Sequence, residues 1–198
     1  MSLKFASVLA MMVVAVPFTA LARPIVEDKN PIVTLKIKDK GDITLELYVK
    51  EAPKTVEHFT DLVSKKFYDG IIFHRVIPGF VAQGGDPASK KLKDADIKGK
   101  TDRDFAGMGL GTGGSGKNIP FEANKLTNET MTVAMALSGP RSATGDSQFF
   151  INLVPNHRLD GDYCVFGKVI KGADVVAKLV SGDRITSARI EPEKKKKK

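Results

Sequence analysis

The sequence contains a single cysteine and no tryptophan. Cys164 has no partner within the chain, so no internal disulfide can form. The three histidines, His58, His74 and His157, are far apart, and the chain has no CxxC pair and no HExxH motif. We therefore predict no metal site. The apolar run around Cys164 is typical of a buried strand, so we interpret its thiol as a core group.

The chain also lacks the usual signatures of nucleotide and acyl chemistry. The stretch GTGGSGKN at 111–118 is close to a phosphate-binding loop, but Asn118 replaces the required hydroxyl and Pro120 prevents a following helix. We instead expect these glycines to let a loop pass close to a neighbouring strand or ligand. No GxSxG motif is present. Asn128-Glu129-Thr130 is a glycosylation sequon, which has meaning only in a host that glycosylates secreted proteins.

The positive charge is concentrated at the two ends of the chain. The formal net charge is +8, but Lys4 and a tail of five lysines, from Lys194 to Lys198, account for six of these charges. The remaining chain is nearly neutral, so we expect no nucleic-acid partner. The tail is typically a solvated segment; the alternative is a weak contact with an anionic surface.

Residues 1–22 have the layout of a secretory signal peptide. Lys4 precedes an apolar run that ends at Phe18, and Ala20-Leu21-Ala22 resembles a cleavage site. The alternative is an uncleaved N-terminal anchor. We predict one folded domain over 23–193 and a basic tail over 194–198. The leader, the lack of disulfides and the lack of an ER-retention ending favour a periplasm, with secretion or the ER lumen as alternatives.

Between these ends the pattern is rich in short strands. Alternating residues predict a hairpin over 32–49, and further strands are predicted at 131–137, 148–154, 163–170 and 185–192. Amphipathic spacing predicts two helices, at 52–67 and 171–180. Many strands with two helices favour a closed or nearly closed sheet. Residues 87–118 read as a long surface loop, with a Lys-rich insert at about 88–108.

Polar residues interrupt two apolar runs. FHRVIPGFVAQGGDP at 73–87 contains Arg75 and Gln83 within two short predicted strands around Pro78-Gly79. Gln148 interrupts a second such run, SQFFIN at 147–152. Buried polar groups need partners, so these residues form either a satisfied structural network or a binding pocket. These residues alone do not decide between a structural network and a binding pocket.

At these residues the sequence resembles a known family. FHRVIPGFVAQGGDP, GTGGSG, VAMA, SQFFIN, LDG and VFGKVIKG, in that order, look like a cyclophilin-type peptidyl-prolyl cis-trans isomerase, here of a bacterial exported type. The similarity spans roughly 31–192. It implies a mainly β fold: an eight-stranded antiparallel closed β-barrel capped by two α-helices. It also implies a monomer that needs no cofactor.

The resemblance implies a role for each matching residue. Arg75 and Gln83 are the predicted catalytic residues, because Arg75 matches the catalytic arginine and Gln83 a group that orients the peptide. The residues that match substrate-binding positions are Phe80, Val81, Ala136, Leu137, Gln148, Phe150, Leu159 and Tyr163. The implied partners are proline-containing peptides and unfolded exported proteins.

The chain departs from the family pattern at the rim of the expected pocket. Arg158 stands where many members carry an aromatic residue, often tryptophan, which argues against strong cyclosporin binding. Tyr163 stands where many have histidine, and Leu137 replaces a polar residue. The alternative to an isomerase is a non-catalytic chaperone or adaptor that holds proline-containing segments.

Overall fold

The computed structural model describes residues 29–192, and its main feature is one eight-stranded sheet. The strands are β1 Ile32–Ile37, β2 Gly41–Leu47, β3 Arg75–Val76, β4 Val81–Gly84, β5 Thr132–Met135, β6 Phe149–Asn152, β7 Val165–Lys171 and β8 Ile185–Ile190. Their order is β3-β4-β6-β5-β7-β2-β1-β8, and every ladder is antiparallel. The predicted mainly β, eight-stranded antiparallel fold is confirmed.

The first hairpin shows why these residues form strands. In β1 the side chains of Leu35 and Ile37 are buried while Lys36 between them is exposed, as expected for a strand with one face on a core. Leu35 pairs with Ile43 of β2, which is also fully buried. The turn between the strands uses Asp39 and Gly41, both with positive φ. Apolar alternation and turn chemistry therefore specify the same register.

The sheet curls, but its edges do not join through a full ladder. β3 and β8 are the two edge strands, and only an isolated bridge between Ile72 and Arg184 connects their ends. Two backbone bonds flank it: the Phe73 N–H donates to Asp183 O at 2.8 Å, and the Ile185 N–H donates to Ile71 O at 2.8 Å. The prediction of a closed barrel was therefore too strong, because β3 is only two residues long and provides little edge to pair.

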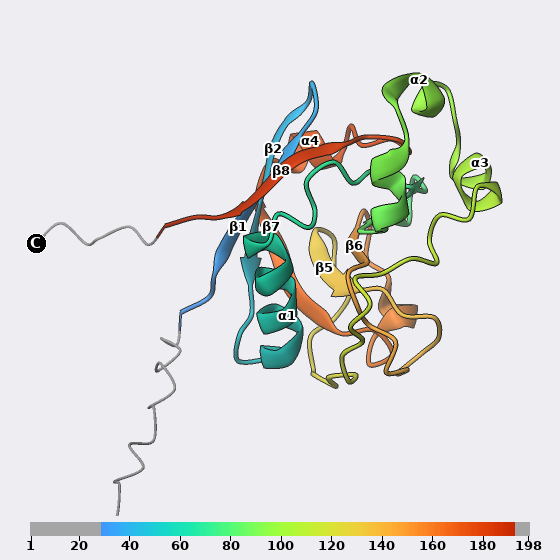
Figure 1. Cartoon of the computed structure of the whole chain (residues 1–198). Helices are drawn as coiled ribbons and strands as arrows, with labels where there is room; N and C mark the ends of the chain where they lie inside the picture. The colour runs from blue at the N-terminus through green and yellow to red at the C-terminus, as the bar shows by residue number, and fades with distance from the viewer. Residues whose placement is uncertain (1–28, 193–198) are drawn as a thin grey trace, which may run out of the picture.

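The first predicted helix is present as α1, Pro53–Ser64. Pro53 occupies its first turn, where the missing N–H has no intrahelical role. Phe59 on its buried face contacts Tyr68, Phe149 and Phe166, with ring centroids 4.9 to 5.5 Å apart. Figure 1 shows α1 at the lower end of the sheet.

The second predicted helix is shorter than expected. We predicted a helix over 171–180, but α4 covers only Ala173–Val176. β7 continues through Lys171, and Gly172 in the left-handed region (φ +83°) separates the strand from the helix. Beyond Val176 the N–H groups of Lys178 and Leu179 donate to the carbonyl oxygens three residues earlier. This hydrogen-bond spacing is that of a 3₁₀ turn and not of an α-helix.

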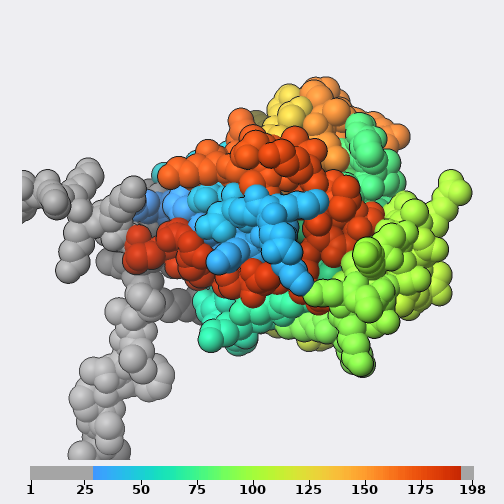
Figure 2. Space-filling model, turned by 90° about the horizontal axis from the view of Figure 1, so that it is seen from above, coloured from blue at the N-terminus to red at the C-terminus, as the bar shows by residue number. Residues whose placement is uncertain are grey.

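The predicted long loop contains local structure of its own. Residues 87–118 include a 3₁₀ helix, η1 Pro87–Lys91, and two short α-helices, α2 Asp94–Ile97 and α3 Asp102–Gly107. A small apolar cluster of Ile72, Ile97, Phe105 and Leu110 attaches this insert to the barrel. Arg184 Nη2 also donates to Leu92 O at 2.7 Å. The insert lies at the side of the molecule away from β1 and protrudes there (Figures 1 and 2).

The predicted signal peptide and the lysine tail lie outside the described residues. No helix within residues 29–192 is long and apolar enough to cross a membrane. The proposed domain limits of 23–193 remain a prediction.

Candidate functional site

Three neighbouring strands align the polar residues singled out in the sequence. Arg75 on β3 is the register partner of Gln83 on β4, and Gln83 is the register partner of Phe150 on β6. Ala134 on β5 continues the same row opposite Phe150. Directly opposed side chains lie on the same face of an antiparallel pair. The sheet therefore places a guanidinium, an amide and an aromatic ring side by side.

A pocket with a volume of about 250 Å³ opens over this row, and most of the residues that line it are apolar. We call it the apolar pocket; its lining residues are Arg75, Phe80, Val81, Gln83, Ala136, Leu137, Phe150, Leu159 and Tyr163. The structure thus brings together nine of the ten predicted site residues. Val81 and Phe150 in its lining are buried in a cluster with Ala134 and Val165. Tyr163 contacts Phe150 edge to face, with ring centroids 5.9 Å apart.

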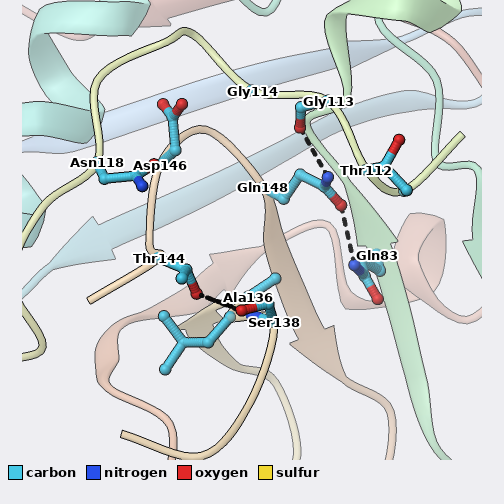
Figure 3. A pocket seen from close by; sticks show the side chains of 12 residues that line it. Gln83, Thr112, Gly113, Gly114, Asn118, Ala136, Ser138, Thr144, Asp146 and Gln148 are labelled. Atoms are coloured by element: carbon cyan, nitrogen blue, oxygen red, sulfur yellow. Dashed lines mark hydrogen bonds between the residues drawn. The ribbon is translucent and has the colours of Figure 1, made fainter. Parts of the chain in front are cut away.

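The tenth predicted residue, Gln148, lines an adjoining pocket of about 400 Å³. This second pocket, the glycine pocket, has the loop 111–114 and Asp146 on one side and Ser138 and Thr144 on the other (Figure 3). Gln83, Ala136 and Leu137 line both pockets. The two pockets therefore adjoin each other, and we call the pair the groove.

Hydrogen bonds connect the guanidinium to the glycine loop. Arg75 Nη1 donates to Gln83 Oε1 at 3.4 Å, and Gln83 Nε2 donates to Gln148 Oε1 at 3.0 Å. Gln148 Nε2 then donates to Gly113 O at 2.8 Å, as Figure 3 shows for the last two bonds. The two alternatives left open by the sequence, a satisfied network and a pocket, are thus both present. The network holds the polar side of the pocket in place.

Two buried aspartates fix the glycine loop, and sequence reasoning missed both of them. Asp86 Oδ2 accepts from the Gly111 N–H at 2.7 Å and the Gly113 N–H at 3.0 Å. A Cβ on Gly113 would lie 2.4 Å from Asp86 Oδ1, so only glycine allows this approach. The expectation that these glycines let a loop pass close to a neighbour is confirmed. Asp86 ends the GGD segment of the motif, which was the available signal.

Asp146 holds the other side of the same loop. Its carboxylate accepts from Ser115 Oγ and from the Gly116 N–H, the latter at 2.9 Å. His58 Nε2 lies 3.3 Å from Asp146 Oδ1. Burial acts to raise the pKa of Asp146, but the hydrogen bonds from Ser115, Gly116 and His58 outweigh it, and the pKa lies below its usual value. This wall of the glycine pocket therefore carries a negative charge at neutral pH.

The opposite end of the groove is positive. The Arg158 guanidinium lies 4.5 Å from the centroid of the Phe80 ring, and that of Arg75 lies 5.4 Å from the same centroid. Arg158 is exposed and belongs to the 3₁₀ helix η2, His157–Leu159. Phe80 thus interacts with two cations, one on each of two separate elements.

Two other sequence features lie in the interior. The thiol of Cys164 is buried, as predicted, and burial raises its pKa to about 11. Asn128 of the sequon is fully buried, and its side-chain amide donates to Asp160 Oδ1 at 3.1 Å. A glycan on this side chain is incompatible with the folded structure.

Together, the curled antiparallel sheet and the groove define a cyclophilin-like protein. A solved cyclophilin-type peptidyl-prolyl cis-trans isomerase from Cryptosporidium parvum superposes with a TM-score of 0.67 at 26% identity. The match covers 83% of this chain and 99% of that one. A second structure of it, in the presence of the dipeptide Ala-Pro, gives a TM-score of 0.65 at 27% identity.

The sequence comparisons identify the family. The profile of the cyclophilin-type peptidyl-prolyl cis-trans isomerases matches residues 32–196. Peptidyl-prolyl cis-trans isomerase B of Bacillus subtilis is 40% identical over 157 residues, 78% of this chain and 94% of the relative. A probable peptidyl-prolyl cis-trans isomerase of Brucella suis is 39% identical over 196 residues, 92% of this chain and 93% of the relative. The chain belongs to the cyclophilin-type peptidyl-prolyl cis-trans isomerase family, and its activity is the cis-trans isomerisation of X-Pro peptide bonds.

Proposed function

We propose that the apolar pocket binds the proline ring of a peptide, that Arg75 promotes rotation of the X-Pro bond, and that the enzyme assists the folding of exported proteins. The observation that carries the catalytic part is the position of Arg75, at the edge of an apolar pocket and in line with Gln83 and Phe150.

The chemistry requires only stabilisation of a twisted amide. Amide resonance opposes rotation with a barrier of about 18–20 kcal/mol, and uncatalysed exchange takes tens of seconds or longer. When the bond twists, the proline nitrogen regains a lone pair that can accept a hydrogen bond. A donor that binds this lone pair acts in the transition state alone and therefore increases kcat. A guanidinium suits the role because it stays charged and has several donors in one plane.

The pocket has the size and surface expected for a small apolar ring. Its volume of about 250 Å³ lies just below the range of about 300–1,000 Å³ that is usual for larger ligands. Phe80, Val81, Phe150 and Leu159 supply apolar walls that would hold the ring while the preceding carbonyl rotates. The dipeptide Ala-Pro, in whose presence the Cryptosporidium parvum structure was determined, supports a proline-containing ligand for this chain as well.

The amides and the backbone of 136–137 would hold the rest of the peptide. A hydrogen bond joins Gln83 and Gln148, so their remaining polar atoms point in fixed directions and can bind the peptide. The Ala136 N–H already donates to Gln148 O at 2.9 Å. The backbone groups that would form hydrogen bonds with a peptide here are therefore the Ala136 carbonyl and the N–H and C=O of Leu137.

A direct test measures catalysed exchange of a short X-Pro peptide by NMR, with the residue before proline varied across the series. We expect the exchange rate to rise in proportion to enzyme concentration for several peptides. Tight peptide binding without any rate increase would instead support a non-catalytic holder of proline segments.

The export part of the proposal rests on the leader-like layout of residues 1–22. Expression in a Gram-negative host, followed by cell fractionation and N-terminal sequencing, tests it. We expect the mature chain in the periplasmic fraction and beginning at Arg23. Cytoplasmic protein that retains Met1 would contradict export.

A further inference from the structure

Arg158 presents a charge at the rim of the apolar pocket that the isomerase chemistry does not use. Its guanidinium lies against Phe80, one of the pocket walls, and the next residue, Leu159, is another wall. A peptide held in the pocket would therefore pass close to this cation.

The segment that carries Arg158 is firmly attached to the pocket. Asn156, just before η2, donates from Nδ2 to Phe80 O at 3.0 Å and to Asn152 Oδ1 at 2.8 Å. The Leu159 N–H closes the turn onto Asn156 O at 2.9 Å. Because the backbone is fixed on the same residue whose ring the guanidinium contacts, Arg158 has a defined place beside the site.

The charge of Arg158 has no carboxylate partner within residues 29–192, whereas its charged neighbours are paired. His157 Nδ1 lies 3.0 Å from Asp160 Oδ2, and Arg141 Nε lies 3.0 Å from Asp162 Oδ1. The residues that line the apolar pocket include no aspartate or glutamate. The groove is thus polarised, with Asp146 at the glycine pocket and the two arginines at the apolar pocket.

We propose that Arg158 is a specificity-determining residue that binds a carboxylate of the substrate peptide, so that the enzyme prefers proline segments with an acidic residue next to the proline on the side away from Asp146. This inference rests on the proposed binding of the proline ring in the apolar pocket. A guanidinium suits the role because its planar donors match the two oxygens of a carboxylate. Contact with Phe80 limits the freedom of the side chain, which reduces the entropy lost on binding.

The test compares matched peptides that carry Glu or Gln either directly before or directly after the proline. Both kcat/KM and the dissociation constant are measured, at about 20 mM and about 500 mM salt. We expect Glu to be preferred at one position by roughly two- to fivefold, the size of an exposed ion pair. The preference should lie in KM and Kd and decrease at high salt, because Arg158 binds the ground state and the transition state alike.

Variants assign the preference to one residue. Arg158→Gln should abolish it, and Arg158→Glu should reverse it, so that the Gln peptide is preferred to the Glu peptide. Arg103→Gln, which removes the same charge from the exposed face of α3, should leave it unchanged. Equal values for Glu and Gln peptides in the wild type, or a Glu preference that survives Arg158→Gln, would overturn the proposal.

The two measurements separate this inference from the isomerase mechanism. Turnover without a charge preference contradicts the role of Arg158 and leaves the proposed function intact. A charge preference in Kd without turnover supports Arg158 and contradicts catalysis by Arg75.

Discussion

Arg75 and Gln83 face each other across β3 and β4, with Arg75 Nη1 3.4 Å from Gln83 Oε1. This is the only hydrogen bond that the side chain of Arg75 forms within residues 29–192. Gln83 is more strongly held, because it also donates to Gln148 at 3.0 Å. The guanidinium is thus oriented by one long bond and by the Phe80 ring, and most of its donors remain available to a substrate.

Removing Gln83 should impair turnover more than removing Gln148. A hydrogen bond to a charged group contributes about 1.5–3 kcal/mol, and the bond from Arg75 to Gln83 is long, so we expect a contribution near the lower value. Gln83→Ala should therefore lower kcat/KM about tenfold. Gln148→Ala should have a smaller effect, because Gln148 contacts Gln83 and not Arg75. Steady-state rates on one X-Pro peptide check the order of the two variants. Equal losses would contradict this order and show that the contact with Arg75 does not distinguish Gln83 from Gln148.

Gly85 should be essential for stability, and Gly79 provides a matched control. Both have positive φ, +105° and +72°, but a Cβ on Gly85 would lie 2.3 Å from Ser147 O, while nothing lies within 4 Å of one on Gly79. We expect Gly85→Ala to lower the free energy of unfolding by about 3 kcal/mol or more, from strain and overpacking together. Gly79→Ala should cost only about 1 kcal/mol. Urea denaturation measures both, and similar losses would refute the steric argument.

His74 should make stability depend on pH. Burial lowers its pKa from 6.5 to about 4; the charge of Asp86 opposes this shift and that of Arg75 adds to it. Between these two values the unfolded chain binds a proton that the folded chain does not. The contribution of a neutral His74 is therefore complete above pH 6.5 and is lost as the pH falls toward 4.

The matched comparison for His74 uses the variant His74→Leu. From about pH 7 to about pH 5, the wild type should lose about 2 kcal/mol more unfolding free energy than the variant. Urea denaturation at the two pH values measures the difference, since all other groups titrate in both proteins. Parallel losses would mean that His74 is not buried as a neutral group.

Local patterns predicted most of the strands. The alternation around Leu35 and Ile43 and the positive-φ turn between them specify one hairpin register, so the sequence and the structure agree there. The helix expected over 171–180 was wrong in length, because pairing of Lys171 with Thr44 extends β7 to the point where the helix was predicted to begin. Tertiary pairing overrode the local helical pattern at that point.

The sequence predicted most residues of the site, but it did not predict how they pair across the sheet or which hydrogen bonds hold them. Gln83 and Phe150 are 67 positions apart, and their pairing depends on the strand order, which alternation does not reveal. Asp86 and Asp146 were missed for the same reason, since each acts on a loop about 25 to 30 residues away along the chain. Their role is visible only when the close approach of Gly113 is known.

The central claim is that Arg75 stabilises the twisted amide, and kcat/KM of Arg75→Ala on a short X-Pro peptide tests it most directly. We expect a decrease of about 10²–10³-fold, the range that removal of one preorganised donor gives, with peptide affinity changed much less. The exposed-site variant Arg103→Ala should retain wild-type activity. Wild-type kcat/KM in Arg75→Ala would contradict the mechanism.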